Sequence, residues 1–527
     1  MSLAPDHAGR RVAVVGAGWA GLAAAFTLKR AGWHPQVFEQ SPVLGGRARK
    51  AVIPRRGVTL DNGQHLMLGA YRHVLELMRD IGVNSEHALL RLPLQLTTLD
   101  GSLSLMANMK HPGPLRLPLA LLNMKGVSAG HKYRLFRALL QLQWSAWRVA
   151  PGTTVLAWLQ AHRQPAALIR LFWEPLCIAT LNTPIADACM RLFAVVLRDS
   201  LASDAKASDL LVPRVDLSAL WPEVLAPELS IHLNTPVRGL SLAPSGYRLH
   251  TDGQNRTNPC DTGQHDPDGH RDAGDGRLDF DAVILAAPPP ICRRLLSQLM
   301  HSNNVNKSTE SIVQDNTDEN RDGTCREPGP TTAAKSALLE QLSAFRYHAI
   351  ATLTIFLEAP FPLPDSMYML KENRKAGFDG QWLFNRSAFM HPVTAAQTIR
   401  EKDTDATTQH NGATPHAICI VISHADHLIG TDRNTIADAI LSQVRSQMPQ
   451  GVALPQVLGY EMIMEKRATF AATPGLGRPE NITPWTGLFL AGDWTNTGYP
   501  GVLEGAVMSG LAAAKAAQTT GSHRQPD

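Results

Sequence analysis

Three glycines near the N-terminus, Gly16, Gly18 and Gly21, have the spacing of a turn that binds a dinucleotide. Gly16 permits a tight turn, Gly18 lets the backbone approach a pyrophosphate, and Gly21 lets a helix pack closely on a strand. Glu39 follows about 20 residues later, where a carboxylate accepts hydrogen bonds from ribose hydroxyls. The pattern predicts a nucleotide cofactor but does not distinguish NAD from FAD.

A second glycine-rich loop distinguishes the two cofactors. Gly45 and Gly46 follow Glu39 at short range and permit another close approach of the backbone. Arg47 comes next and supplies a positive charge for phosphate. Two such loops close together in the sequence favour FAD.

The C-terminal part carries further residues for the same cofactor. Gly492 and Asp493 end a predicted strand, so Asp493 is placed to accept hydrogen bonds from the ribityl chain or to shape the pyrophosphate site. Pro500 and Gly501 begin a predicted helix, whose positive end favours the anionic form of a reduced flavin. The alternative for Asp493 is a helix cap.

The elements that must position these residues predict an α/β fold. Apolar stretches at 11–15 and 36–39 are predicted strands on either side of an Ala-rich helix at 22–31, and this order predicts a parallel sheet. Periodicity predicts further helices at 131–149, 155–171, 188–201 and 502–517, and further strands at 231–235, 246–251, 282–287, 347–357 and 488–491. Polar stretches without such periodicity predict mobile insertions at 252–276, 301–332 and 401–414.

Composition limits the classes of protein that fit. The chain has 527 residues, 44% of them hydrophobic and 18% charged, which excludes a disordered chain. The net charge of +4 is too small to indicate a nucleic-acid partner. The six cysteines form no Cys-x-x-Cys pair, so we expect no metal site, no disulfide framework and a reducing compartment. No uninterrupted apolar stretch reaches the length of a spanning helix, about 18 residues.

The combined motifs resemble a known superfamily. The turn at Gly16, the loop Gly45-Gly46-Arg47-Ala48 and the segment 491–506 are similar to those of flavin amine oxidases and phytoene desaturases. Four further segments resemble the squalene-associated FAD-dependent desaturases, which are the hydroxysqualene dehydroxylases of bacterial hopanoid synthesis: Asp61–His65, Trp173–Leu176, Leu181–Pro184 and Glu465–Phe470. The resemblance covers most of the chain outside the three polar insertions.

The resemblance implies a discontinuous, Rossmann-like FAD-binding domain of the amine oxidase type with an inserted α+β substrate domain. FAD-binding parts are expected at 1–88, 231–300 and 465–527, and substrate parts at 89–230 and 333–464, with the mobile insertion 301–332 between them. FAD is expected to be non-covalent, because the cysteine that carries covalent FAD in amine oxidases has no counterpart in 496–499. The residues expected to bind FAD, with Val237 contacting adenine through its backbone, are Gly16, Gly18, Trp19, Ala20, Gly21, Glu39, Gln40, Gly45, Gly46, Arg47, Gln64, His65, Val237, Gly492, Asp493, Gly501, Val502 and Leu503.

The resemblance also implies a reaction, the reduction of hydroxysqualene to squalene. Loss of the allylic hydroxyl as water leaves a delocalised cation, and a hydride from the reduced flavin captures that carbon. The reaction needs an electron donor such as NADPH, an acid that assists the departing hydroxyl, and a dry apolar channel. The expected acids are Asp61 and His65, with Glu174 and Glu504 as alternatives, and Gln64 is expected to hydrogen-bond the isoalloxazine.

Three other functions stay open at this point. A carotenoid-type desaturase or isomerase would oxidise or rearrange an apolar polyene with the same cofactor. An amine oxidase would need an aromatic cage and a small polar pocket, and a non-catalytic FAD-binding lipid carrier would hold a redox-silent flavin. For the favoured function, the expected partners are a long-chain isoprenoid substrate and squalene-synthase-like enzymes.

The distribution of charge predicts a membrane surface as a further partner. Residues 101–173 contain nine basic residues and no Asp or Glu, so this segment alone exceeds the net charge of the chain. The segment also contains an apolar stretch at 117–124 and the pair Trp144 and Trp147. These features favour peripheral binding to an anionic leaflet, and we expect a cytoplasmic protein on the inner face of the cytoplasmic membrane. The alternative is a solvated basic face on a helix of the substrate domain.

Overall fold

A computed structural model describes residues 9–107, 113–202, 206–252, 278–300, 330–390 and 416–521 of the protein. The predicted insertion at 401–414 lies outside these ranges, as do all but the first residue of 252–276 and all but the last three of 301–332. Those last three residues begin helix α13 (Pro330–Ser343), so this end of the predicted insertion is helical.

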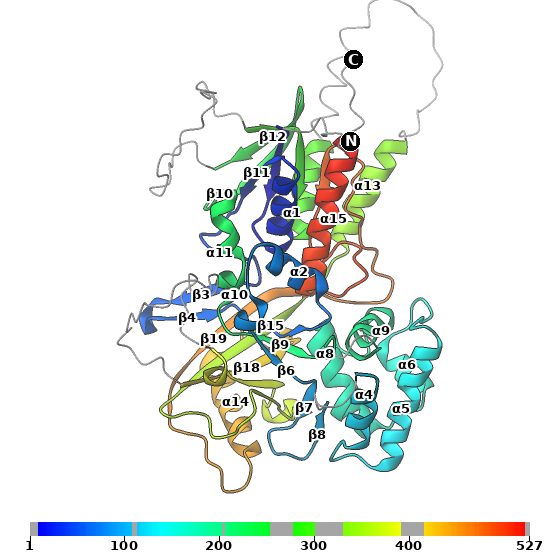
Figure 1. Ribbon diagram of the computed structural model, residues 1–527, viewed down its shortest axis with the longest axis vertical. Coiled ribbons are helices and arrows are strands. Elements are labelled where there is room, and N and C mark those ends of the chain that lie inside the picture. The colour runs from blue at the N-terminus through cyan, green and yellow to red at the C-terminus, as the bar shows by residue number, and fades with distance from the viewer. Residues whose placement is uncertain are drawn as a thin grey trace, which may run out of the picture.

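A five-stranded parallel sheet forms the upper part of the molecule in Figure 1. Two of its strands, β1 (Arg11–Val15) and β14 (Ala282–Leu285), are apolar and largely buried, as expected for the interior of a parallel sheet that is covered on both faces. The strand order is β10 (Ser230–His232), β2 (His34–Phe38), β1 (Arg11–Val15), β14 (Ala282–Leu285) and β20 (Leu488–Leu490). The predicted α/β fold with a Rossmann-like sheet is confirmed, while the predicted domain boundaries stay a prediction.

Alternate residues of β1 face two different layers. Val14 packs with helices α1 (Trp19–Arg30) and α15 (Leu503–Gly521), which lie side by side on one face (Figure 1). Ala13 packs on the other face, in the same core as the antiparallel sheet β11 (Val237–Ala243), β12 (Gly246–Thr251) and β13 (Leu278–Phe280). A glycine permits the helix contact, because a Cβ at Gly510 would lie 2.2 Å from the main-chain oxygen of Ala20.

A second five-stranded sheet lies below the first and is antiparallel between neighbours. Its order is β16 (Met367–Met369), β17 (Trp382–Asn385), β18 (His416–Ser423), β15 (Tyr347–Leu357) and β19 (Val457–Phe470). One face packs against α14 (Arg433–Gln447) through residues such as Ile420, whereas Val421 belongs to the opposite face and lines the cavity described below. The predicted strand at 347–357 is confirmed to the residue.

Short helices and small sheets complete the lower part of the molecule. The small sheets pair β3 (Lys50–Ile53) with β4 (Val58–Asp61), β9 (Leu210–Pro213) with β5 (Met67–Leu68) and β6 (Leu89–Leu92), and β7 (Gln95–Thr97) with β8 (Ser104–Met106). The helices are α2 (Arg72–Asp80), α3 (Ser85–Ala88), α4 (Gly113–Leu122), α5 (Ala129–Trp144), α6 (Val155–Ala161), α7 (Ala166–Leu168), α8 (Glu174–Leu181), α9 (Met190–Leu197), α10 (Leu217–Leu220) and α11 (Pro222–Leu225).

The prediction of one continuous helix at 155–171 is wrong. Helix α6 ends at Ala161, because Arg163 adopts a left-handed backbone conformation with φ of 52° and Pro165 follows it. A π-helical turn at Ile169–Trp173 then leads directly into α8. Buried apolar residues such as Leu159 and Leu168 lie on both sides of this break, so the apolar periodicity of the sequence continues across it and predicted one helix.

Asn182 joins the helical part of the molecule to the second sheet. It caps α8 in a left-handed conformation with φ of 49°, which Asn tolerates better than most residues. Its Nδ2 donates to the Thr469 hydroxyl at 3.0 Å and to the main-chain oxygen of His348 at 3.3 Å, and its Oδ1 accepts from the main-chain N–H of His424 at 2.6 Å. One buried side chain therefore fixes β15, β19 and the residue that follows β18 relative to α8.

Replacing Asn182 should loosen this junction. We expect Asn182→Gly, which keeps the left-handed cap and removes all three side-chain bonds, to lower the free energy of unfolding by about 2–4 kcal/mol. Asn182→Asp keeps the acceptor for His424 but turns a carboxylate oxygen toward the His348 carbonyl and buries a charge, so it should be destabilised as well. Thermal melting of both variants measures the effect, and wild-type stability of the glycine variant would contradict the role given to Asn182.

Candidate active site

One cavity brings together almost all of the residues that the sequence predicts to bind FAD. Its volume is about 600 Å³, and it runs between the parallel sheet and the second sheet. Seventeen of the predicted cofactor residues line it: Gly16, Gly18, Trp19, Ala20, Glu39, Gln40, Gly45, Gly46, Arg47, Gln64, His65, Val237, Gly492, Asp493, Gly501, Val502 and Leu503. Gly21 lies behind this wall, where a Cβ would come within 2.0 Å of the Gly16 oxygen.

The N-terminus of α1 forms a cradle at one end of the cavity. A Cβ at Gly16 would lie 2.6 Å from the main-chain oxygen of Ala286, so the turn itself requires glycine. Gly18 differs, because it has an ordinary φ of −74° and the nearest protein atom to its added Cβ is 3.7 Å away. No side chain caps the helix at Gly18. A pyrophosphate can therefore lie close to the backbone here, because Gly18 leaves room for it. The start of α1 offers it main-chain N–H groups and a positive helix end.

Glu39 occupies the place predicted for the ribose carboxylate. Its Oε2 accepts from the Ala17 N–H and its Oε1 from the Ser41 N–H, each at 2.8 Å, and the residue is buried. The carboxylate thus also fixes the glycine turn. Val237 lies nearby at the start of β11, because the main-chain N–H of Thr235 donates to the main-chain oxygen of Glu39 at 2.8 Å.

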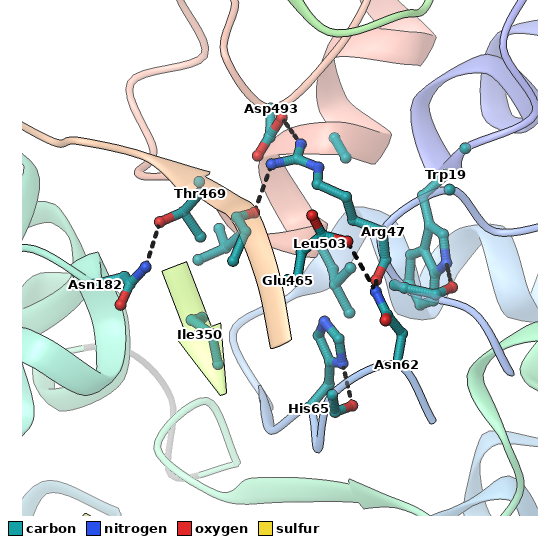
Figure 2. A pocket seen from close by; sticks show the side chains of 18 of the residues that line it. Trp19, Arg47, Asn62, His65, Asn182, Ile350, Glu465, Thr469, Asp493 and Leu503 are labelled. Carbon is teal, nitrogen blue, oxygen red and sulfur yellow. Dashed lines mark hydrogen bonds and ion pairs between the residues drawn. The ribbon is translucent and has the colours of Figure 1, made fainter. Parts of the chain in front are cut away.

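Arg47 connects three segments of the chain at the centre of the cavity (Figure 2). Its guanidinium donates to Asp493 Oδ1 at 2.5 Å and to the main-chain oxygen of Ala468 at 2.7 Å. Asn62 Nδ2 in turn donates to the Arg47 oxygen at 3.1 Å. The second glycine loop, the end of β19 and the loop after β20 are therefore held around one charge.

A second arginine, Arg478, shapes the loop that carries Asp493. Its guanidinium donates to main-chain oxygens of Asp493, Trp494, Thr495 and Tyr499 and to the Thr497 hydroxyl. Burial lowers the pKa of Arg478 to about 10, so the group remains charged at neutral pH. The sequence analysis missed this residue, and it lies in an irregular segment with no motif that could have indicated it.

His65 faces the cavity as an acceptor. Its Nδ1 lies 2.8 Å from the Gly63 oxygen, and a carbonyl can only accept, so Nδ1 carries the proton and Nε2 is left with its lone pair. Burial lowers the pKa of His65, which keeps the ring neutral at pH 7. Gln64 also lines the cavity, although its Oε1 accepts from Arg386 at 3.2 Å.

Asp61 does not line the cavity. Its Oδ1 accepts from the Leu217 N–H at 2.8 Å and its Oδ2 lies 3.5 Å from Arg386. Burial raises the pKa of Asp61 to about 6, against the opposing charge of Arg386. Of the two predicted acids, only His65 lines the cavity and is placed to touch a molecule inside it.

The two alternative acids also lie away from the cavity wall. Glu504 is buried and accepts from the N–H groups of His73 and Val74, so it caps the start of α2. Glu174 begins α8, and burial raises its pKa. Neither residue lines the cavity.

A tyrosine–aspartate pair on the cavity wall was not predicted. The Tyr499 hydroxyl donates to Asp199 Oδ2, and both residues line the cavity. Burial raises the pKa of Tyr499, so the phenol keeps its proton at neutral pH. The two residues are separated by about half of the chain, and neither Asp199 nor its neighbours form a motif.

The other half of the cavity is apolar. Leucines from β7, β8, α5, α8 and β9 form one wall, and residues of the second sheet form the facing wall. The apolar lining includes Leu94, Leu96, Leu105, Leu139, Phe172, Leu176, Leu210, Ile350, Met367, Trp382, Phe384 and Val421. Such a wall can hold an extended hydrocarbon next to the nucleotide motifs.

A histidine–aspartate cluster lies behind Asn182. One potential ligand atom from each of His348, His424 and Asp426 lies within 4.8 Å of the others. His348 Nδ1 hydrogen-bonds Asp426 at 2.9 Å, and none of the three lines the cavity. The cluster supports the Asn182 junction through the main chains of His348 and His424.

The fold and the site define a dinucleotide-binding oxidoreductase whose glycine loops fit a flavin nucleotide. The chain belongs to the family of flavin containing amine oxidoreductases, which it matches over residues 19–309 and 335–518. It is accordingly a flavin-dependent enzyme, as the sequence predicts.

Individual relatives and solved structures extend this result. The chain is 26% identical to the hydroxysqualene dehydroxylase of Rhodopseudomonas palustris, over 96% of this chain and 97% of the relative. It is 24% identical to the hydroxysqualene dehydroxylase of Zymomonas mobilis, over 95% of this chain and 97% of that relative. Among solved structures, cyclohexylamine oxidase from Brevibacterium oxydans superposes with a TM-score of 0.61 at 15% identity and covers 97% of this chain and 99% of its own. The predicted resemblance is confirmed, and the structural likeness confirms the fold.

In the part of the chain that the structure describes, no helix is both long and apolar enough to span a bilayer.

Glu39 is the residue whose loss should weaken flavin binding most directly. Glu39→Ala removes the acceptor for Ala17, Ser41 and the ribose, so we expect the Kd for FAD to rise about tenfold or more. Fluorescence titration of the apoprotein with FAD gives this value. Glu76→Ala, which changes an exposed carboxylate on α2, serves as the control. Unchanged FAD affinity in the Glu39 variant would place the ribose site elsewhere.

Proposed function

We propose that the enzyme reduces hydroxysqualene to squalene. The observation that carries the proposal is the continuity of the cavity, which runs from the nucleotide motifs into a wall of leucines. A linear C30 hydrocarbon matches this wall, whereas a small polar amine does not. The proposal is further supported by the hydroxysqualene dehydroxylases that resemble the chain over almost its whole length.

In this proposal the nucleotide half of the cavity holds FAD. The N-terminus of α1 and Gly18 receive the pyrophosphate, Glu39 the ribose, and Asp493 with the segment after Pro500 the ribityl chain and the ring. When it is bound and reduced, FAD supplies the hydride for the allylic carbon. The chain itself positions the substrate, excludes water and assists the departure of the hydroxyl.

Tyr499 and Asp199 are the groups that we propose to act on the departing hydroxyl. Asp199 orients the phenol of Tyr499 by accepting its proton in a hydrogen bond. The phenol can turn that proton toward the oxygen of the substrate, which leaves as water. The proposal moves this role away from Asp61, which lies outside the cavity wall, and from His65, whose free Nε2 is an acceptor. The leucine wall keeps water from the cation that is left behind.

The proposed reaction oxidises the flavin by two electrons, so a donor must reduce the flavin again before the next turnover. We propose a reduced nicotinamide such as NADPH as the donor. The substrate is proposed to come from squalene-synthase-like enzymes, because its carbon skeleton is that of squalene.

A carotenoid-type desaturase is the second candidate. A short segment of the chain is 40% identical over 73 residues to a 15-cis-phytoene desaturase of Synechococcus elongatus. The apolar half of the cavity suits a polyene equally well. The two candidates differ in direction, since a desaturase takes hydride from its substrate.

The direction of the reaction is tested by product analysis. Enzyme reduced without oxygen in D₂O should convert one hydroxysqualene per flavin into squalene, with one deuterium on the carbon that carried the hydroxyl. Mass spectrometry of the product gives both numbers. Squalene without deuterium would reject hydride transfer from the flavin, and no squalene at all would reject the proposed substrate.

The role of Tyr499 is tested by removing its hydroxyl. Tyr499→Phe should lower kcat about 10²-fold with little change in the flavin spectrum, because the departing oxygen loses its proton donor. Tyr460→Phe, which removes a hydroxyl that hydrogen-bonds Asn434 and does not line the cavity, is the control and should have the wild-type kcat. A Tyr499 variant with wild-type kcat would assign the donor to another group.

A further inference from the structure

The outer side of α5 carries an apolar stripe that the rest of the described structure does not cover. Tyr133, Phe136, Leu140 and Trp144 recur at helical spacing and form this outer stripe. The exposed fractions are 65% for Tyr133, 40% for Phe136 and 80% for Trp144. The opposite side of the same helix is buried, through Leu135, Ala138, Leu139 and Leu142. The helix is therefore apolar on two faces, of which one belongs to the core.

Basic side chains surround the outer stripe. Arg134 and Arg137 are exposed on α5 beside Tyr133, and Lys125 and Arg148 are exposed in the segments that precede and follow the helix. The half-buried Lys132 lies on the other flank, where its ammonium donates to the main-chain oxygen of Leu122, a residue that is itself 67% exposed. None of these five basic side chains forms an ion pair with a carboxylate among the described residues. Residues 101–173 themselves contain no Asp or Glu that could form one. The surface thus combines exposed aromatic rings with uncompensated positive charge.

We propose that this surface docks on an anionic lipid bilayer. Aromatic side chains such as tyrosine and tryptophan insert at the boundary between headgroups and acyl chains, and basic residues beside them attract anionic headgroups. A second copy of the chain would meet the same positive charge on the facing surface, which opposes pairing at this site. The charge therefore favours a membrane over self-association.

The docking surface is connected to the cavity by a single helix. Leu139 lies on the inner side of α5 and lines the apolar half of the cavity, whereas the outer stripe lies on its far side. Figure 1 places α5 at the outer edge of the helical part, away from the parallel sheet. The functional meaning of the docking rests on the proposed function, because a hydrocarbon substrate is stored in the bilayer and would enter beside this helix.

Vesicle sedimentation with the full-length holoenzyme tests the proposal. Vesicles of phosphatidylcholine with phosphatidylglycerol are compared with pure phosphatidylcholine at low and high salt. We expect binding to the anionic vesicles at low salt, a large loss at high salt, and a loss of at least tenfold on replacing Lys132, Arg134 and Arg137 together by Gln, since each basic residue contributes up to about fivefold. Trp144→Ser should weaken binding at both salt concentrations.

Matched variants separate this surface from the rest of the protein. One control replaces three exposed basic residues on α2 and α14 together by Gln, namely Arg72, Arg79 and Arg445, and so changes the same number of charges elsewhere. The other control, Leu458→Ser, removes an exposed apolar side chain outside the stripe. Neither control should alter binding. Negligible binding under all conditions, or equal losses in the controls, would overturn the proposal. Self-association that Trp144→Ser abolishes, without vesicle binding, would assign the stripe to a second copy and also overturn it.

Turnover in detergent micelles distinguishes this proposal from the proposed function. If the enzyme converts hydroxysqualene in micelles but ignores vesicles, the docking surface is wrong and the function stands. If it binds anionic vesicles through α5 but converts no hydroxysqualene in micelles, the docking surface stands and the function is wrong.

Discussion

The site depends on the contact between Arg47 and Asp493, two residues from opposite ends of the chain. Arg47 ends the second glycine loop and Asp493 follows the last strand of the parallel sheet, and their charged groups meet inside the cavity. The same guanidinium also holds the main-chain oxygen of Ala468 at the end of β19. The parallel sheet and the second sheet are thereby joined at the point where a nucleotide and a hydrocarbon would meet. Since Asp493 is almost fully buried, loss of Arg47 would leave an uncompensated charge there.

Close approach of the backbone is the second constraint on this site. At Gly16 and Gly21 the protein itself leaves no room for a side chain, whereas at Gly18 it leaves room that a ligand would use. A Cβ at Gly46 would lie 2.9 Å from the Cα of Gly18, so the two glycine loops contact each other directly. The nucleotide half of the cavity consequently combines close-packed glycine main chain with the charged side chains of Glu39, Arg47 and Asp493, whereas the other half is lined by apolar side chains. This division lets one cavity bind a charged cofactor and exclude water from an apolar substrate.

Much of the fold and of the nucleotide site could be predicted from the sequence, because both depend on local patterns. The strand at 11–15, the glycine spacing and Glu39 lie within one supersecondary unit, and the structure confirms the strand and brings Gly16, Gly18 and Glu39 to one cavity wall. The polar side of the proposed substrate site could not be predicted in the same way. Tyr499 and Asp199 meet only through the tertiary fold, and Arg478 organises its loop through main-chain oxygens that leave no pattern in the sequence. Asp61 does not line the cavity although Gln64 and His65 of the same motif do, because a motif gives the position of a residue along the chain but not the direction of its side chain.

We propose that a reduced flavin and an apolar alcohol meet in one cavity and that electrons flow to the alcohol. Anaerobic rapid mixing measures this flow through the absorbance of the flavin. Photoreduced enzyme mixed with hydroxysqualene should regain the spectrum of oxidised flavin within one turnover, and oxidised enzyme mixed with phytoene should keep its spectrum. The opposite direction of electron flow would be established if the flavin stayed reduced with hydroxysqualene and phytoene bleached the oxidised flavin. That result would overturn the proposed reduction of the alcohol.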